Sequence, residues 1–198
     1  MKIILSSKSQ TRKKILNYVG IKFLQKKPPI NEEEIKKELI VRKINPRTIC
    51  QTLAKKKSLS NSLTFPNFFC IGIDSCLIFK NKFLSKPPSK KKAKEMLVLL
   101  NGRKHVLYSS VYISINGKKA WKFNDEATLT LYKLSNKKMD NYIKRISLKN
   151  IKMSGLYQIE GKGATLFEKI EGDLFTILGL PLIPLLGFFK RSNINAWK

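Results

Sequence analysis

The chain has 198 residues, of which 42% are hydrophobic and 10% aromatic, so it can bury a core and is not a disordered polyelectrolyte. Its 40 Lys and Arg residues against 13 Asp and Glu residues give a formal net charge of +27, which favours a polyanionic partner such as nucleic acid or a phosphate-rich ligand. The lysines occur in short clusters along the whole chain, which is typical of a solvated basic surface rather than of a dedicated nucleic-acid face.

In chain order, we expect a strand at 3–5, helices at 11–19, 31–40 and 46–57, a strand at 68–79, a helix at 90–100, strands at 105–115 and 118–134, a helix at 136–146, a strand at 164–170, and a buried loop followed by a core-docked helix within 174–189. The helix starts are marked by capping residues, namely Ser9, Asn45, Ser89 and Ser135. Asn116-Gly117 is the strongest hairpin signal. These elements predict an α/β protein with a central mixed, twisted sheet flanked by helices, in a single domain over 1–198.

Neither the cysteines nor the apolar segments indicate secretion or a membrane. The three cysteines show no metal-ligand spacing and are odd in number, which favours a reducing, cytoplasmic compartment. The N-terminus has only three apolar residues in a row, too few for a signal peptide. The uncharged segment 174–189 is shorter than the roughly 20 residues of a membrane helix and contains two Pro and two Gly. We therefore expect no membrane partner.

The segment that joins the first strand to the first helix has the composition of an anion site. Ser7 and Ser9 supply hydroxyl groups, Arg12 falls within the first helical turn, and the first N–H groups of a helix carry partial positive charge. The segment is either a phosphate cradle or an ordinary capped surface helix.

Asp74 interrupts an otherwise apolar strand. A buried ionised carboxylate is costly unless a cation, a metal or hydrogen-bond donors compensate for it. If the following hairpin has a three-residue loop at 80–82, Asp74 and Lys86 lie diagonally on one face, about 7 Å apart at Cα. A two-residue loop would instead place them on opposite faces. The two residues therefore form either a structural ion pair or part of a reactive site.

Three further residues have both a functional and an ordinary interpretation. Glu32 begins a run of three acids, which fits a metal ligand or a solvated first helical turn. Lys57 stands at the predicted end of its helix, where a positive charge is favourable in any case. Glu160 lies among glycines at 155, 161, 163 and 172, which suggests a backbone that approaches a ligand closely, or simply turns. The one histidine, His105, can build neither a typical metal site nor a catalytic triad.

Six segments, read in order, resemble motifs of the Maf family of nucleoside triphosphate pyrophosphatases. They are ILSSKSQTRKKIL, INEE, LAKKKS, IGIDSCLIF, LSKPPSKKKAKEMLVLLNGRKH and IEGKGATLFEKIEGDLFTILGLPL. They resemble, in turn, the family's ILAS-S-RR opening, its I-D-E, its L-A-x-x-K-A, its G-A-D-T strand, its block of G-K-P, helix and S-G-x-x-H, and its glycine-rich stretch closing in I-E-G-D and V-G-L-P. One such motif would be weak evidence, whereas six in order across nearly the whole chain are specific.

The resemblance implies a fold, an activity and a set of roles. The implied fold is an elongated α/β structure with a cleft between two lobes, often dimeric. The implied activity is hydrolysis of a nucleoside triphosphate, canonical or modified, to the monophosphate and pyrophosphate with a divalent metal, Mg or Mn. The implied roles are catalysis by Asp74 and Lys86; substrate binding by Ser7, Arg12, Lys57, Ser75 and Glu160; and metal binding by Glu32 and Asp74.

The chain also departs from the family pattern. Gln10 and Thr11 replace the Pro and the first Arg of the opening motif, and Asn31 replaces the Asp before the glutamate. The stretch MSGLYQIE fits a branch of the family with a Y-x-I-E-G form, which we interpret as subgroup identity. Two rival hypotheses remain open. One is a basic nucleic-acid-binding protein, although the aromatic residues are not interleaved with a basic stripe. The other is a nucleotide-binding regulator with weak or no catalysis.

Overall fold

The computed structural model describes residues 2–197, with side-chain detail outside 152–154. Its elements are β1 (Lys2–Ser6), α1 (Gln10–Tyr18), β2 (Leu24–Lys26), α2 (Glu32–Val41), α3 (Pro46–Thr64), β3 (Phe68–Phe79), β4 (Lys82–Leu84), α4 (Lys90–Leu100), β5 (Lys104–Ile115), β6 (Lys118–Leu131), α5 (Asn136–Arg145), α6 (Leu148–Ser154), the 3₁₀ helix η1 (Lys162–Leu166), β7 (Phe167–Glu171), α7 (Leu174–Ile177) and α8 (Leu182–Arg191).

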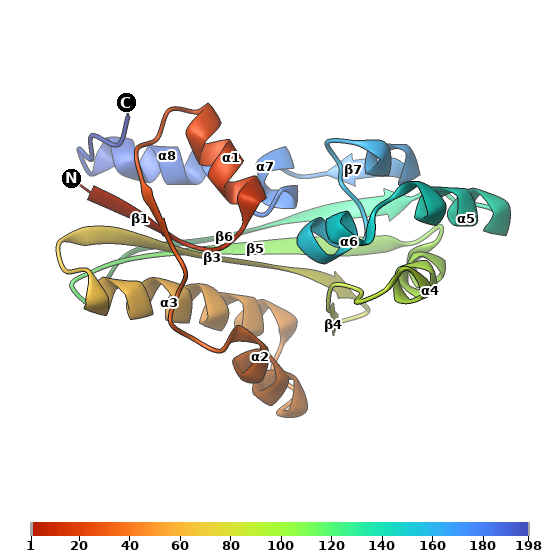
Figure 1. Ribbon diagram of the computed structural model, residues 1–198, viewed down its shortest axis with the longest axis horizontal. Coiled ribbons are helices and arrows are strands. Elements are labelled where there is room, and N and C mark those ends of the chain that lie inside the picture. The colour runs from red at the N-terminus through yellow and green to blue at the C-terminus, as the bar shows by residue number, and fades with distance from the viewer. Residues whose placement is uncertain (1, 198) are drawn as a thin grey trace.

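The strands form one mixed sheet that runs along the long axis of the molecule (Figure 1). The order is β2-β1-β3-β5-β6-β7, and β4 pairs with the end of β3. The strands β2, β1 and β3 are parallel, whereas β5, β6 and β7 continue the sheet in antiparallel pairs. Helices α2 and α3 lie on one side of the sheet, and α1, α7 and α8 lie on the other (Figure 1).

Strand β3 lacks a neighbour over part of one edge. There, β1 pairs with residues 68–72 and β4 with residues 77–79, while β5 pairs with 70–78 on the opposite edge. Within the described strands, residues 73–76 therefore have no strand beside them on the β1 side. Asp74 lies in this gap. The chain leaves the carboxyl end of β1 there and turns into α1, as at the ligand sites of other open α/β sheets.

Helix α3 packs unusually close to β3. A Cβ atom on Gly72 would lie 2.1 Å from the carbonyl oxygen of Ala54 and 2.4 Å from the backbone nitrogen of Ser58. Only glycine allows this approach. The buried stripe of α3 has helical spacing and includes a charged residue, Lys57, one turn from Ala54 and Leu53. The contact therefore brings the Lys57 side chain to the surface of the sheet.

The side chains of β3 alternate between the two layers. Ile71 and Ile73 belong to the core that includes residues of α1 and α8, and Gly72 faces α3. Because successive side chains of a strand point to opposite faces, Asp74 lies on the α3 side, and Ser75 lies on the side of α1 and α7. The side chains of Asp74 and Ser75 therefore lie on opposite faces of the sheet.

The two larger of three hydrophobic cores within residues 2–197 divide the molecule into two lobes. The first is built mainly by β1, β3, β5, α1 and α8, and the second by α4, α5, α6, β6 and β7. They lie toward opposite ends of the long axis (Figure 1). The prediction of an α/β fold with a central mixed sheet and two lobes is confirmed. The Asn116-Gly117 hairpin is also confirmed, because both residues have positive φ, at 50° and 71°, as a two-residue turn requires.

Some predicted boundaries are wrong. Helix α3 does not end at Lys57 but continues to Thr64, because Ser58, Asn61 and Ser62 extend its buried face although they are polar. The segment expected to be a strand at 164–170 begins as the 3₁₀ helix η1, and β7 starts only at Phe167.

Short elements were not predicted. Strand β2, helix α6 and helix α7 have three, seven and four residues, too few for a periodic signal. Helix α7 occupies part of the expected buried loop, and α8 is the expected terminal helix. No helix within residues 2–197 is both long and apolar enough to cross a bilayer.

The only histidine lies in the core of the second lobe and predicts a pH dependence of stability. Burial lowers the pKa of His105 from 6.5 to about 4, an effect that the backbone of Arg103 partly offsets. Folding therefore favours the neutral imidazole. Its contribution to stability is fully present above pH 6.5 and is lost as the pH falls toward 4. We expect the free energy of unfolding to fall by about 3 kcal/mol more in the wild type than in His105→Gln between pH 7 and pH 4.

Urea denaturation of both proteins over this pH range measures the difference. The carboxyl groups titrate in both proteins, so their effect cancels in the comparison. Parallel pH profiles for the two proteins would contradict a neutral, buried His105.

Candidate functional site

A cleft of about 620 Å³ opens between the two lobes. One wall comes from the turn after β1, the first turn of α1, and helices α2 and α3. The other comes from the β3–β4 hairpin, α4 and residues 155–160. The cleft is lined by all eight residues predicted to form the site, namely Ser7, Arg12, Glu32, Lys57, Asp74, Ser75, Lys86 and Glu160.

Lys57 lies between two carboxylates at the gap in the sheet. Its Nζ is 2.8 Å from Asp74 Oδ1 and 2.6 Å from Glu32 Oε2. The side chains of Lys57 and Asp74 are 5% and 13% exposed, whereas that of Glu32 is 40% exposed at the mouth of the cleft. The buried carboxylate of Asp74 therefore has a cationic partner, which offsets the cost of placing a charge within an apolar strand.

The acidic partners keep Lys57 protonated. Burial lowers the pKa of Lys57, and the charge of Arg12 acts in the same direction. The charge and hydrogen bond of Asp74, together with the charge of Glu32, outweigh both, so the pKa is raised overall. One ammonium group thus remains at the meeting point of two carboxylates.

The guanidinium of Arg12 is held by protein groups. Nε donates to the carbonyl oxygen of Gly179 (2.8 Å), and one terminal nitrogen donates to the Ile73 carbonyl (3.0 Å) and to Ser7 Oγ (3.3 Å). The other terminal nitrogen donates to Ser75 Oγ (3.0 Å). Arg12 therefore joins the turn after β1, the open edge of β3 and the turn after α7.

The charge of Arg12 remains available to an anion. Burial lowers the pKa of Arg12, and the charge of Asp74 is the largest opposing effect. Within residues 2–197, no carboxylate forms a salt bridge with Arg12. A buried cation without an ion pair gives the cleft a positive potential close to the first turn of α1.

Residues that the sequence analysis did not single out hold Ser75 in place. Ser109 Oγ lies 2.9 Å from both Ser75 Oγ and the carbonyl oxygen of Thr176. Thr176 Oγ1 donates to Asp125 Oδ2 at 2.7 Å. Ser109 and Asp125 face each other across β5 and β6, so the one signal in the sequence was a pair of polar residues inside two strands. Their partner on α7 lies far away in the chain and left no such signal.

The hairpin after β3 has a two-residue loop, not the three-residue loop considered above. Leu77 pairs with Leu84 and Phe79 with Lys82, and both turn residues, 80 and 81, have positive φ. Lys86 nevertheless lines the same cleft as Asp74, because β4 ends at Leu84 and the chain then leaves the ladder. The rule that placed the two residues on opposite faces holds only within a continuous ladder.

The cleft has a charged half and an apolar half. The charged half contains the residues around Lys57, Arg12 and Asp74. The apolar half is lined by Leu77, Phe83, Leu84, Met96, Leu107, Leu156, Tyr157 and Ile159, with Glu160 beside them. This division suits a ligand with a polyanionic end and a flat, largely apolar end.

The charged half also suits a divalent cation in part. Two carboxylates, Glu32 and Asp74, already converge on one positive charge, and carboxylate oxygens are the ligands that Mg and Mn prefer. Within residues 2–197, no group of three or more His, Cys, Asp or Glu side chains is placed to hold a metal. A metal here would therefore complete its coordination with water and ligand oxygens, as Mg commonly does at phosphate sites.

Comparison with known proteins identifies the family. The family model described as Maf-like protein matches residues 2–192. This chain belongs to the Maf-like protein family. A nucleoside triphosphate pyrophosphatase of Pelagibacter ubique is 39% identical to the Maf-like chain over 188 residues, covering 95% of this chain and 96% of the relative. A 7-methyl-GTP pyrophosphatase of Bartonella quintana is 38% identical over 192 residues, covering 97% and 96%. A nucleoside triphosphate pyrophosphatase of Caulobacter vibrioides is 35% identical, covering 95% and 94%.

Proposed function

We propose that this chain is a nucleoside triphosphate pyrophosphatase, with residues 1–198 acting as one Maf-like domain. The observation that carries the proposal is the pairing of Asp74 with Lys57 in a cleft that is charged at one end and apolar at the other. The names of the relatives support the same reaction class. Water attacks the α-phosphorus of the triphosphate, and the bond to the β-phosphate oxygen breaks to release pyrophosphate.

Each side chain of the charged half has a proposed part in this reaction. Asp74 accepts the proton of the attacking water. Lys57 and Lys86 bind the phosphate oxygens, and Arg12 adds positive potential while it holds Ser7 and Ser75 in place. The first turn of α1 supplies backbone donors for the same anion. Glu32 and Asp74 would hold a Mg or Mn ion, which would neutralise phosphate charge and lower the pKa of water when bound.

The apolar half is the proposed site of the nucleobase. Phe83, Met96 and Tyr157 offer surfaces for a flat ring, and Glu160 offers a carboxylate that can accept N–H groups from the edge of a guanine. A 7-methylguanine ring carries a positive charge, which an aromatic wall and an acidic residue both favour. The relatives named 7-methyl-GTP pyrophosphatase make this modified nucleotide a leading candidate.

A pyrophosphate-release screen tests the proposed function. Canonical triphosphates and 7-methyl-GTP are compared with Mg, with Mn and with a chelator. Turnover that depends on the metal supports the proposal. Tight nucleotide binding without turnover would favour a nucleotide-binding regulator. Binding to DNA or RNA that weakens steeply with salt, again without turnover, would favour a nucleic-acid-binding protein.

The pH dependence of the reaction should report Lys86. Lys86 is exposed at the rim of the cleft, yet partial burial by the cleft walls lowers its pKa. The positive charges of Arg12 and Lys57 lower the pKa further, and the negative charge of Asp74 opposes them. The protonated form that binds phosphate is therefore lost below the usual 10.5 as the pH rises. Because arginine stays protonated throughout this range, Lys86→Arg should move the alkaline limb of kcat/KM to higher pH.

Full pH–rate profiles of both proteins measure this shift. An exposed lysine of α4, Lys92, provides the matched control, and Lys92→Arg should leave the limb where it is in the wild type. An alkaline limb at the same pH in Lys86→Arg and in the wild type would show that another group causes it.

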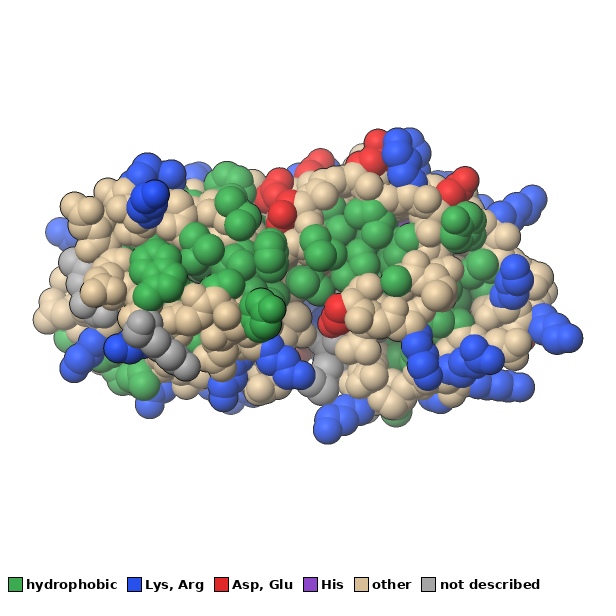
Figure 2. Space-filling model, turned by 90° about the horizontal axis from the view of Figure 1, so that it is seen from above, with side chains coloured by type: hydrophobic (Ala, Val, Ile, Leu, Met, Phe, Trp, Pro, Cys, Tyr) green, Lys and Arg blue, Asp and Glu red, His purple; other side chains and the backbone are tan. Residues whose placement is uncertain are grey.

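Two properties of the surroundings complete the proposal. We place the protein in the cytoplasm, which is supported by three cysteines that are all buried and free of disulfide bonds. We expect neither a stable nucleic-acid complex nor a membrane partner. Support for the first expectation comes from the Lys and Arg side chains, which lie mostly around the margins of the face seen in Figure 2 and do not form a single stripe on it.

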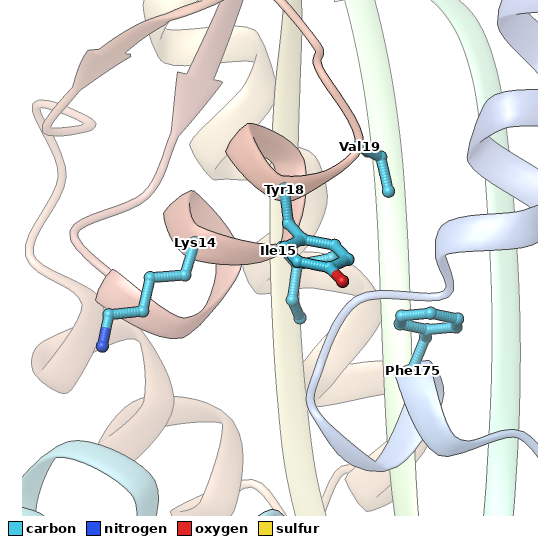
Figure 3. Close-up of a pocket in the computed structure, with 5 residues that line it drawn as sticks. All are labelled: Lys14, Ile15, Tyr18, Val19 and Phe175. Carbon is cyan, nitrogen blue, oxygen red and sulfur yellow. The ribbon is translucent and has the colours of Figure 1, made fainter.

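A homodimer is the proposed assembly. Hydrophobic side chains form a band along the face seen in Figure 2. Helices α1, α7 and α8 lie on one side of the sheet (Figure 1), and their residues Tyr18, Leu174 and Ile183 are 94%, 53% and 60% exposed. A hollow of about 230 Å³ lies beside Tyr18, where Ile15 and Tyr18 of α1 and the following Val19 approach Phe175 of α7 (Figure 3). An apolar patch of this kind is typical of an interaction surface.

Sedimentation equilibrium checks the assembly. We expect a dimer for the wild type and a shift toward the monomer for Tyr18→Ser. A wild-type protein that stays monomeric at high concentration would contradict the proposed dimer.

The hollow is lined by one charged residue, Lys14, whose side chain points away from Phe175 (Figure 3). Its lining therefore offers no group of catalytic side chains.

A further inference from the structure

The wall of the apolar half has no regular secondary structure to hold it. Residues 155–160 lie between α6 and η1, yet they place Leu156, Tyr157, Ile159 and Glu160 against the cleft. An irregular segment takes a defined shape only when specific contacts offset its conformational entropy. The position of the proposed nucleobase wall therefore depends on its anchors.

The anchor on the central sheet is Tyr157. Its hydroxyl group forms a hydrogen bond of 2.5 Å with Nε2 of His105 on β5, and its ring meets Phe167 of β7 edge-on at 4.7 Å between centroids. The wall also has hydrogen bonds to helices. Tyr142 of α5 donates to the Leu156 carbonyl at 3.2 Å, for example. Tyr157 thus both lines the cleft and forms a hydrogen bond with a strand in the middle of the sheet.

Apart from the nearby backbone of Arg103, the side-chain partner of the His105 imidazole is Tyr157. His105 is 2% exposed and does not line the cleft, and Nδ1 has no hydrogen-bond partner of normal geometry within residues 2–197. A buried imidazole costs free energy that an apolar side chain in the same place would not. The contact that ties this polar ring to another side chain is the hydrogen bond with Tyr157.

We propose that His105 is a positioning residue for the nucleobase: through Nε2 it fixes the hydroxyl group of Tyr157, and thereby the wall at 155–160. The proposal rests on the proposed function, because it takes the apolar half of the cleft as the nucleobase site. It assigns His105 no contact with the phosphates. Loss of the His105–Tyr157 hydrogen bond should weaken binding of the nucleoside part of a substrate and leave binding of the phosphates unchanged.

Two ligands separate these effects. The first is a guanosine triphosphate analogue with an imido group between the α- and β-phosphorus atoms, and the second is inorganic tripolyphosphate, which has no nucleoside. Calorimetry gives a Kd for each. Tyr157→Phe and His105→Phe each remove the hydrogen bond, and we expect either to raise the Kd of the analogue about fivefold or more while the Kd of tripolyphosphate stays within twofold.

Two further variants make the test specific. His105→Gln keeps a hydrogen-bonding nitrogen or oxygen near the place of Nε2, so it should restore at least half of the lost affinity. Tyr108→Phe removes a hydroxyl group that accepts a hydrogen bond from Gln51 at 2.7 Å, on the same strand but outside the cleft, and should change neither Kd. The double variant Tyr157→Phe/His105→Phe should lose no more affinity than either single variant.

Specific outcomes would overturn the proposal. It fails if the Kd of the analogue is unchanged in Tyr157→Phe and His105→Phe, or if the Kd of tripolyphosphate rises in parallel, since that would be a general loss of structure. The binding experiment does not require turnover. A further outcome is that the wild type hydrolyses no triphosphate, while the variants still bind the analogue more weakly than the wild type does and bind tripolyphosphate equally well. In that case the proposed function fails and the positioning role of His105 stands.

Discussion

Replacing Asp74 with Asn is expected to lower kcat/KM for a nucleoside triphosphate by about 10³-fold. Asparagine has the same shape but neither accepts the proton of water nor carries the charge that Lys57 contacts at 2.8 Å. It would also remove one of the two carboxylates that could hold a metal. Pyrophosphate release at saturating metal measures the loss, and circular dichroism checks that the variant is folded.

A matched surface variant controls for the charge change. Asp140 of α5 forms an ion pair with Lys94 and is about 40% exposed, and it does not line the cleft. Asp140→Asn makes the same chemical change away from the site and should keep the rate within twofold. Equal rates for Asp74→Asn and the wild type would reject the role assigned to Asp74 and, with it, the mechanism.

Gly72→Ala should destabilise the fold by about 3 kcal/mol or more. The added methyl group would collide with the backbone of α3 at Ala54 and Ser58, at 2.1 and 2.4 Å. Backbone cannot move aside as a flexible side chain can, so helix and strand must separate. Urea denaturation measures the loss. Because α3 carries Lys57, the folded fraction of the variant should also lose activity.

Gly161→Ala is the control for this variant. An added Cβ at Gly161 has its nearest neighbour at 3.9 Å, the carbonyl oxygen of Gln158, so the free energy of unfolding should change little. If Gly72→Ala is as stable as Gly161→Ala, the close packing of α3 on β3 is not essential to the fold.

The sequence predicted the long elements well. Strong local signals explain the success: Ser89 and Ser135 cap their helices as expected, and Asn116-Gly117 makes the expected turn. The site residues came from motif order, and all eight line one cleft. What each of them does in that cleft stays a prediction, since their placement alone tests no role.

The contacts between site residues could not be predicted, because they depend on packing between distant segments. The sequence placed Lys57 at the end of its helix. In the structure, α3 continues to Thr64, and Lys57 lies on the buried face of the helix, where its ammonium group contacts Asp74. Arg12 was expected to bind phosphate directly, whereas its hydrogen bonds go to protein groups as far away as Gly179. No local pattern reveals a bond that spans 167 positions.

That bond between Arg12 and Gly179 has a consequence for synthesis on the ribosome. The turn after α7 is synthesised 167 residues after Arg12. Until residues 179–191 emerge, the buried guanidinium has no Gly179 carbonyl to bind, and the first lobe lacks its covering helix α8. A nascent chain therefore holds Arg12, Lys57 and Asp74 well before it has the Gly179 carbonyl that helps to fix Arg12 in the cleft.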